Sequence, residues 1–122
     1  MGSTSDEPHA KKITDRLDEY GIAWEQHAAS AHKTPLKVLD ILEANKDQSG
    51  IVYVTIAGRS NALSGFVAAN TEFPTLACPP FSDKEDMLEN IQSTLQMPSN
   101  TPVLTVIDPG NCALAVKRIF GA

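Results

Sequence analysis

The run Ile-Val-Tyr-Val-Thr-Ile-Ala at positions 51–57 is the feature that most constrains the fold of this chain. It is almost entirely apolar and rich in β-branched residues, so it lacks the alternation expected of a strand with one face in water. Such a run is typical of a strand that is covered on both faces, as in a parallel sheet between helices. The turn-forming residues 58–61 (Gly-Arg-Ser-Asn) then end it.

Three further segments are predicted to be strands. Residues 22–28 alternate apolar and polar side chains, which is typical of an edge strand with one exposed face. Residues 74–78 form a short strand that ends at two prolines, neither of which could donate to a sheet hydrogen bond. Residues 103–107 form the last predicted strand.

Helical periodicity separates these strands. Apolar residues three and four positions apart over 10–20 predict a first helix, which Ser5 or Asp6 would cap and Gly21 would end. The other helices are predicted from Pro35 to before Gly50 and over 62–67, 87–95 and 113–120.

This order of elements predicts one α/β domain over residues 1–122, a three-layer αβα sandwich around a doubly wound, flavodoxin-like parallel sheet. The length suits a single core. In the common five-stranded order the first strand lies in the middle of the sheet, and no strand is predicted before Gly2. We therefore expect either that upstream residues exist in the natural gene product or that the molecule is impaired.

The charge and composition exclude several classes of partner. The formal net charge of −5 argues against nucleic acid or acidic lipid as a partner, since both require clustered Lys and Arg. No apolar run approaches a membrane span and no signal segment is evident, so a cytoplasmic protein without a membrane partner is expected. Cys78 and Cys112 are far apart and are predicted to be buried thiols in a reducing compartment.

The first candidate binding loop runs from Gly2 to Asp6, directly before a helix. Backbone N–H groups and the positive end of the helix dipole favour an anion there, so Ser3 is a candidate phosphate ligand. Asp6 could accept hydrogen bonds from sugar hydroxyls. Plain helix capping is the alternative explanation.

The second candidate loop is Ser30 to Thr34. His32 is the candidate proton carrier, because the ordinary pKa of imidazole lies near neutral pH, and Lys33 could offer a cation to a phosphate. A structural histidine beside a solvated lysine is the alternative. His9 is expected on a polar helix face and His27 on the outer face of an edge strand, neither with a catalytic role.

The third candidate loop is Gly58 to Ser64, where Gly58 permits close backbone approach and Ser60 and Asn61 offer donors and acceptors. A plain strand-to-helix turn is the alternative. Ligands gather at the carboxyl ends of strands in parallel sheets, so the three loops should converge on one crevice. Neither metal-ligand spacing nor a G-x-S-x-G motif is present.

Five segments in this order resemble the phosphoribosylaminoimidazole carboxylase (AIR carboxylase, PurE) family of purine biosynthesis. They are GSTSD at 2–6, SAHKTP at 30–35, AGRSNALSGF at 57–66, CPP at 78–80 and STLQMPS at 93–99. The third of these, followed by CPP, is similar to the class II enzymes, which add carbon dioxide directly to the aminoimidazole. The other class, which rearranges an N5-carboxylated substrate, typically has a loop resembling A-G-G-A-A-H-L-P-G.

The resemblance implies a carbon–carbon lyase that carboxylates 5-aminoimidazole ribonucleotide (AIR) with CO₂ to 4-carboxy-AIR (CAIR), without ATP, metal or any other cofactor. It implies that His32 handles the proton at ring carbon 4, and that the enzyme is a symmetric homo-oligomer, an octamer. An N5-CAIR mutase and a non-catalytic nucleotide-phosphate binding module remain alternatives. The resemblance assigns the ribose phosphate to Ser3, Asp6, Ser30 and Lys33, and the imidazole and CO₂ pocket to Gly58 and Ser60.

Overall fold

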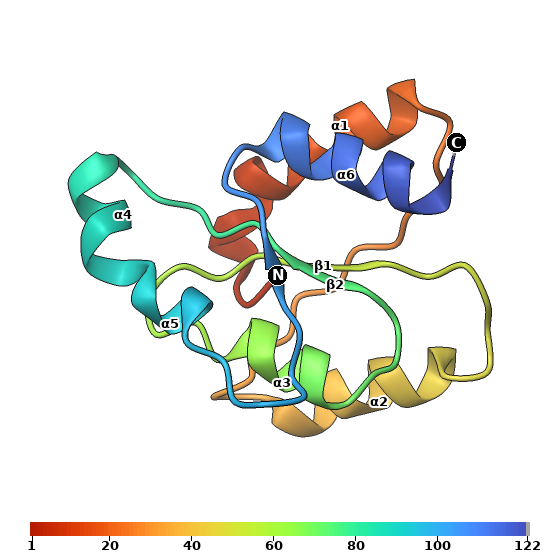
Figure 1. The fold of residues 1–122 in the computed structure, drawn as a ribbon, viewed down its shortest axis with the longest axis horizontal. Coiled ribbons are helices and arrows are strands. Elements are labelled where there is room, and N and C mark those ends of the chain that lie inside the picture. The colour runs from red at the N-terminus through yellow and green to blue at the C-terminus, as the bar shows by residue number, and fades with distance from the viewer. Residues whose placement is uncertain (122) are drawn as a thin grey trace.

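The computed structural model describes residues 1–121 and places helices on both faces of a parallel sheet (Figure 1). Leu76 in the middle strand pairs with Val54 on one side and with Leu104 on the other. The α/β fold with a parallel sheet, predicted from the run 51–57, is thus confirmed. The strands lie in the order β1 (Tyr53–Thr55), β2 (Thr75–Ala77) and β3 (Leu104–Thr105).

The helices form the two outer layers (Figure 1). On one face α1 (Glu7–Glu19) packs along α6 (Pro109–Phe120), and on the other α2 (Pro35–Asn45) lies beside α3 (Leu63–Ala69). The short helices α4 (Lys84–Asn90) and α5 (Gln92–Leu95) follow the carboxyl end of β2. Within residues 1–121, no helix combines the length and the apolar character that crossing a membrane requires.

Two apolar clusters fill the space between the layers. The α1 face contributes Ala10, Ile13 and Leu17, which lie three and four positions apart as the sequence predicted, and these pack with α6 and β2. The opposite cluster joins α2 and α3 through Val38, Leu42, Leu63 and Val67. Cys78 and Cys112 lie in the first cluster and are fully buried free thiols, as predicted.

The predicted edge strand over residues 22–28 is wrong. The segment is extended, but it forms no ladder with a strand of the described sheet. Its hydrogen bonds instead reach Met1, whose amine donates to the His27 carbonyl and whose carbonyl accepts from the Ala29 amide, both at 2.9 Å. A strand requires a neighbour along its length, and one residue does not provide it.

The predicted start of the first helix also needs correction. Asp6 is the N-cap residue of α1, one of the two predicted, but its side chain makes no capping hydrogen bond. Ser3 instead supplies a capping side chain one turn earlier, where its hydroxyl accepts from the Ser5 amide at 3.2 Å. A short 3₁₀ turn, Thr4–Asp6, therefore precedes α1. Gly21, with φ of 68°, lies just beyond the end of this helix as predicted.

The fourth helix, predicted as one over 87–95, is divided at Ile91 into α4 and α5. The Ser93 hydroxyl donates to the Asn90 carbonyl at 3.2 Å and accepts from the Asn61 amide at 2.9 Å. This bridge ties α5 to the loop after β1, which helical periodicity alone cannot indicate.

Replacement of Leu76 by Ala should lower the free energy of unfolding by about 2–5 kcal/mol, because it opens a cavity at the centre of the sheet. Leu76 is 1% exposed. Urea unfolding measures the change. The matched control is Leu36→Ala, at a side chain 74% exposed, which should cost no more than about 0.5 kcal/mol. Equal losses would contradict the central position of Leu76.

Candidate active site

The loops selected from the sequence meet where β1 and β2 end. The Gly2 amide donates to the Ile56 carbonyl at 3.0 Å, which brings the first loop to the end of β1. His32 Nε2 lies 3.0 Å from the Ser60 carbonyl oxygen, which joins the second loop to the third. The structure thus places the residues chosen at Gly2–Asp6, Ser30–Thr34 and Gly58–Ser64 around one end of the sheet.

The loop from Ser30 to Thr34 is organised by two hydroxyl groups. Ser30 Oγ accepts hydrogen bonds from the backbone amides of His32 and Lys33, at 3.2 and 3.0 Å. Thr34 Oγ1 closes the turn by accepting from the Ser30 amide at 2.8 Å and donating to the Ser30 carbonyl at 3.3 Å. Because the lone pairs of Ser30 Oγ are engaged, its O–H proton is available to an outside acceptor.

The contact between His32 and Ser60 fixes the tautomer of the imidazole. A carbonyl oxygen only accepts, so Nε2 of His32 carries the hydrogen that it donates to Ser60. In the neutral ring, Nδ1 then holds the free lone pair and is the atom able to take up a proton. His32 and Lys33 are both exposed, so a ligand can reach them.

Ser60 is one of two non-glycine residues with positive φ in the described chain, at 44°. That conformation costs a residue with a side chain roughly 1–2 kcal/mol, so the surrounding structure must hold it in place. The neighbouring Asn61 does so. Its amide donates to Ser93 Oγ at 2.9 Å, and its side chain is 5% exposed.

Asn61 is the centre of a buried polar network. Its Nδ2 donates to Ser64 Oγ at 2.7 Å and to Thr94 Oγ1 at 3.0 Å, while its Oδ1 accepts from the Ser64 amide. Ser64 Oγ in turn lies 2.7 Å from Thr55 Oγ1 on β1. Sequence reasoning considered Asn61 only as a ligand or a cap, and missed that it connects α3 with α5 and, through Ser64, with β1.

Gly58 faces the loop that follows β2. A Cβ atom at Gly58 would lie 2.9 Å from the Pro80 carbonyl oxygen, closer than real Cβ contacts come. Only glycine therefore permits this approach of the two loops. Beside Gly58, Arg59 is exposed and lies near Asp86. The hydrogen bond from the Ser82 amide chiefly lowers the pKa of the Asp86 carboxyl, and Arg59 adds to that effect.

In the first loop, Ser3 is exposed and Asp6 is partly buried. Burial raises the pKa of Asp6, and the amine of Met1 opposes this shift. Burial also lowers the pKa of the Met1 amine, so the two groups are a partly desolvated pair. Ser3 faces solvent, with its hydroxyl 2.9 Å from that of Ser5.

The expectation that His9 lies on a polar helix face is wrong. It is partly buried because α1 lies over the end of β2, and its Nε2 is 3.0 Å from the Cys78 carbonyl oxygen. Burial lowers the pKa of His9, and the bond to that carbonyl opposes the shift. His27 is exposed as expected, and its Nε2 lies 3.4 Å from a carboxylate oxygen of Glu25.

Cys78 does not supply a nucleophile. A hydrogen bond with Cys112 and burial raise the pKa of the Cys78 thiol well above its ordinary value. A protonated, buried thiol reacts poorly. Over residues 1–121, no group of three or more His, Cys, Asp or Glu side chains is arranged to hold a metal ion.

Comparison with known proteins agrees with this arrangement. A family profile described as AIR carboxylase matches residues 1–122. The chain belongs to the AIR carboxylase family. It is 49% identical over 120 residues to a phosphoribosylaminoimidazole carboxylase of Archaeoglobus fulgidus, a match that covers 98% of this chain and 66% of the archaeal protein.

Two further relatives show how widely the family domain occurs. The crystal structure of Treponema denticola PurE superposes with a TM-score of 0.91 at 44% identity, over 99% of this chain and 77% of that one. The human bifunctional phosphoribosylaminoimidazole carboxylase/phosphoribosylaminoimidazole succinocarboxamide synthetase is 38% identical over 123 residues, 99% of this chain and 28% of its own. The chain thus spans a part of each relative's length.

Substitution of Gly58 by Ala should lower the free energy of unfolding by about 1–3 kcal/mol, because the new methyl group meets a backbone carbonyl that cannot move freely. Urea unfolding measures it. The control is Gly65→Ala in α3, where the methyl group meets the flexible end of Met97 at 3.0 Å. That change should be neutral or stabilising by up to about 1 kcal/mol. An equal loss at both glycines would contradict the close approach at Gly58.

His9 should make the protein less stable as the pH falls below about 6.5. The folded-state pKa of His9 is depressed, so the unfolded chain binds the proton more readily, and stability present above the unfolded pKa is lost on acidification. Urea midpoints at pH 7.5 and 5.5 should differ less in His9→Gln than in the unsubstituted protein. The exposed-site control His27→Gln should keep the original difference; a reduced one would contradict the assignment to His9.

Proposed function

We propose that this site carboxylates AIR with CO₂ to CAIR in de novo purine biosynthesis, without ATP. The carrying observation is the imidazole of His32 held by the Ser60 carbonyl where three polar loops meet. The names of the relatives from Archaeoglobus fulgidus and Treponema denticola, both phosphoribosylaminoimidazole carboxylases at 49% and 46% identity, support the reaction. The loop AGRSNALSGF followed by CPP supports direct carboxylation.

The proposed reaction depends on the positions of the two substrates and on a base, more than on activation of the nucleotide. Carbon 4 of the aminoimidazole is enamine-like and attacks the carbon of CO₂, which forms the C–C bond and a carboxylate. The ring proton then leaves carbon 4 for Nδ1 of His32, and the aromatic ring is restored. Positioning contributes several kcal/mol, and a well-placed base contributes roughly 10²–10⁴-fold in rate.

The ribose phosphate would be held by local donors, because the chain as a whole is acidic at −5. The Ser30 hydroxyl has its proton available, the Lys33 ammonium is exposed on the same loop, and Ser3 lies at the surface before α1. The N-terminus of this helix adds a favourable dipole. Asp6, with its raised pKa, would accept a hydrogen bond from a ribose hydroxyl.

The imidazole and CO₂ would lie against the loop from Gly58 to Ser60. CO₂ is uncharged and small, so a narrow pocket lined by backbone suits it, and backbone N–H groups would stabilise the new carboxylate. Gly58 presents no side chain to these groups, and its closeness to Pro80 leaves no room for one.

Incubation of the protein with AIR and bicarbonate, without ATP, tests the proposed reaction. CAIR, separated by chromatography, should accumulate at a rate that rises with bicarbonate. A parallel incubation with the N5-carboxylated nucleotide distinguishes the mutase: faster conversion of that substrate, indifferent to bicarbonate, would contradict the proposal.

The substitution His32→Asn should lower kcat about 10²–10⁴-fold with a small change in KM, because it removes the proton acceptor and keeps the phosphate ligands. The control His27→Asn, at an exposed histidine outside these loops, should retain full activity. Tight nucleotide binding without turnover, unchanged by His32→Asn, would indicate a binding module instead.

A further inference from the structure

Two consecutive prolines follow β2 at the end of the sheet where the candidate site lies. The Cys78 amide still bonds to β1, because it donates to the Thr55 carbonyl at 2.9 Å. Pro79 and Pro80 have no N–H group, so the chain beyond Cys78 has no backbone donors of its own to hold it. The position of residues 78–80 therefore depends on packing and on groups that donate to their carbonyl oxygens.

His9 supplies the donor for the first of these carbonyls. Its Nε2 lies 3.0 Å from the Cys78 carbonyl oxygen and 3.5 Å from Cys78 Sγ. Because the acceptor is a carbonyl, Nε2 carries the hydrogen of this bond. Cys78 is fully buried, and in the part of the chain that the structure describes His9 is the one donor to its carbonyl. A buried carbonyl without a partner is unfavourable, so the end of β2 would move if this donor were removed.

The two prolines form one side of the candidate site. Pro79 is fully buried, and a Cβ atom at Gly58 would lie 2.9 Å from the Pro80 carbonyl oxygen. Because the two backbones are this close, a displacement of Pro80 must either displace Gly58 or open a gap beside it. His9 is therefore connected to the Gly58 loop through a segment that is stiff, since each proline fixes its own φ angle.

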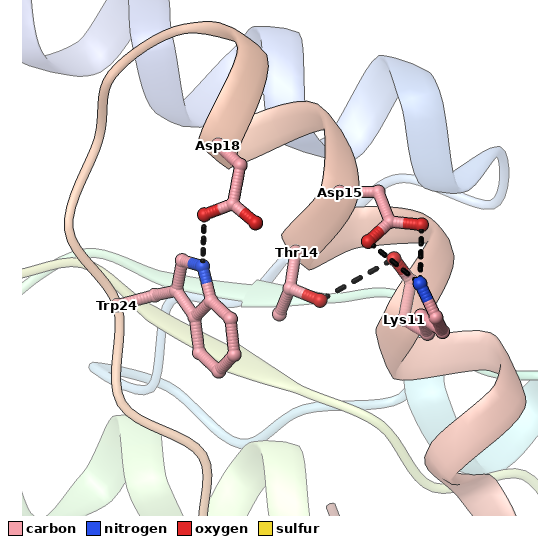
Figure 2. A network of polar contacts seen from close by, with 5 residues as sticks. All are labelled: Lys11, Thr14, Asp15, Asp18 and Trp24. Atoms are coloured by element: carbon pink, nitrogen blue, oxygen red, sulfur yellow. Dashed lines mark hydrogen bonds and ion pairs between the residues drawn. The ribbon is translucent and has the colours of Figure 1, made fainter.

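The helix that carries His9 is held on more than one side. Its apolar face packs against α6 and β2 in the first of the two clusters. Figure 2 shows contacts outside that cluster: Trp24 Nε1 donates to Asp18 Oδ1 at 2.8 Å, and Lys11 forms an ion pair with Asp15 at 2.8 Å. The first of these contacts ties the segment after α1 back to the helix. Since α1 is packed against the core, the imidazole of His9 is fixed relative to β2.

We propose that His9 is a positioning residue for the carboxylation. Its hydrogen bond to the Cys78 carbonyl holds Pro80 against Gly58, and so sets the width of the pocket for CO₂. This inference rests on the proposed function, in which CO₂ lies against the loop from Gly58 to Ser60. CO₂ is small and uncharged, so its binding depends on how closely the pocket walls approach it. The phosphate ligands proposed above lie on other loops, so loss of the hydrogen bond should affect the use of CO₂ and not the binding of AIR.

Two substitutions at this position separate the hydrogen bond from the rest of the side chain. His9→Leu removes the donor and keeps an apolar group of moderate size, whereas the amide introduced by His9→Gln can donate to the same carbonyl. With AIR and bicarbonate, His9→Leu should lower kcat/KM for CO₂ about 10–100-fold and leave the KM for AIR within about two-fold. His9→Gln should recover kcat/KM for CO₂ to within about three-fold of the unsubstituted protein.

The control Ile13→Val weakens the same helix and leaves the hydrogen bond intact. Ile13 is 3% exposed, so this substitution should lower the thermal unfolding midpoint and keep kcat/KM for CO₂ within about two-fold. An equal loss of kcat/KM in Ile13→Val and His9→Leu would overturn the proposal, because it would assign the effect to stability. A loss in His9→Gln as large as in His9→Leu would also overturn it, because the donor alone would then not be sufficient.

A second measurement does not use AIR, so it tests the geometry separately from the reaction. The amide resonances of Gly58 and Arg59, followed by proton–nitrogen NMR, should move in His9→Leu, return in His9→Gln and stay in place in Ile13→Val. Unchanged resonances in His9→Leu would overturn the proposal. If these shifts occur and the unsubstituted protein forms no CAIR, the link from His9 to Gly58 stands, while the proposed function and the role of His9 in it are overturned.

Discussion

The buried hydrogen bonds of Thr55, Asn61, Ser64 and Thr94 are the interaction on which the site depends. Thr55 belongs to β1, Ser64 to α3 and Thr94 to α5, so the Asn61 side chain joins α3 to α5 and Ser64 extends the link to β1. A buried donor left without a partner costs about 1–3 kcal/mol, which makes such a network stable only when it is complete. The loop between β1 and α3 is fixed as a result.

The fixed loop explains how an exposed histidine is held in one orientation. Ser60 precedes Asn61 and is kept at positive φ, and its carbonyl accepts from His32. The His32 loop is stiffened separately by Ser30 and Thr34. Two independently ordered turns thus meet through one bond, which sets the tautomer of the ring.

The sequence predicted the parallel sheet and the layers. The apolar run 51–57 indicates a strand that is buried on both faces, and the spacing of apolar residues in α1 indicates a helix that is buried on one face. The strand predicted at 22–28 was wrong, because alternating apolar and polar residues indicate which face is exposed but not whether a neighbouring strand is present to pair with. The loops of the site followed from the rule that ligands gather at strand ends. The network of Asn61 could not be predicted in this way, because Thr94 lies 33 positions away and no local pattern shows that the two residues meet.

The hydrogen bonds of Met1 to His27 and Ala29 make the two ends of this chain unequal for protein engineering. The amino end lies at the middle of the molecule, whereas α6 ends at the periphery with Phe120 exposed (Figure 1). A purification tag fused ahead of Met1 would be joined to a partly buried residue whose amine and carbonyl are both hydrogen-bonded. A tag beyond α6 would follow the exposed Phe120 instead, which makes the carboxyl end the suitable place for affinity handles and for surface immobilisation.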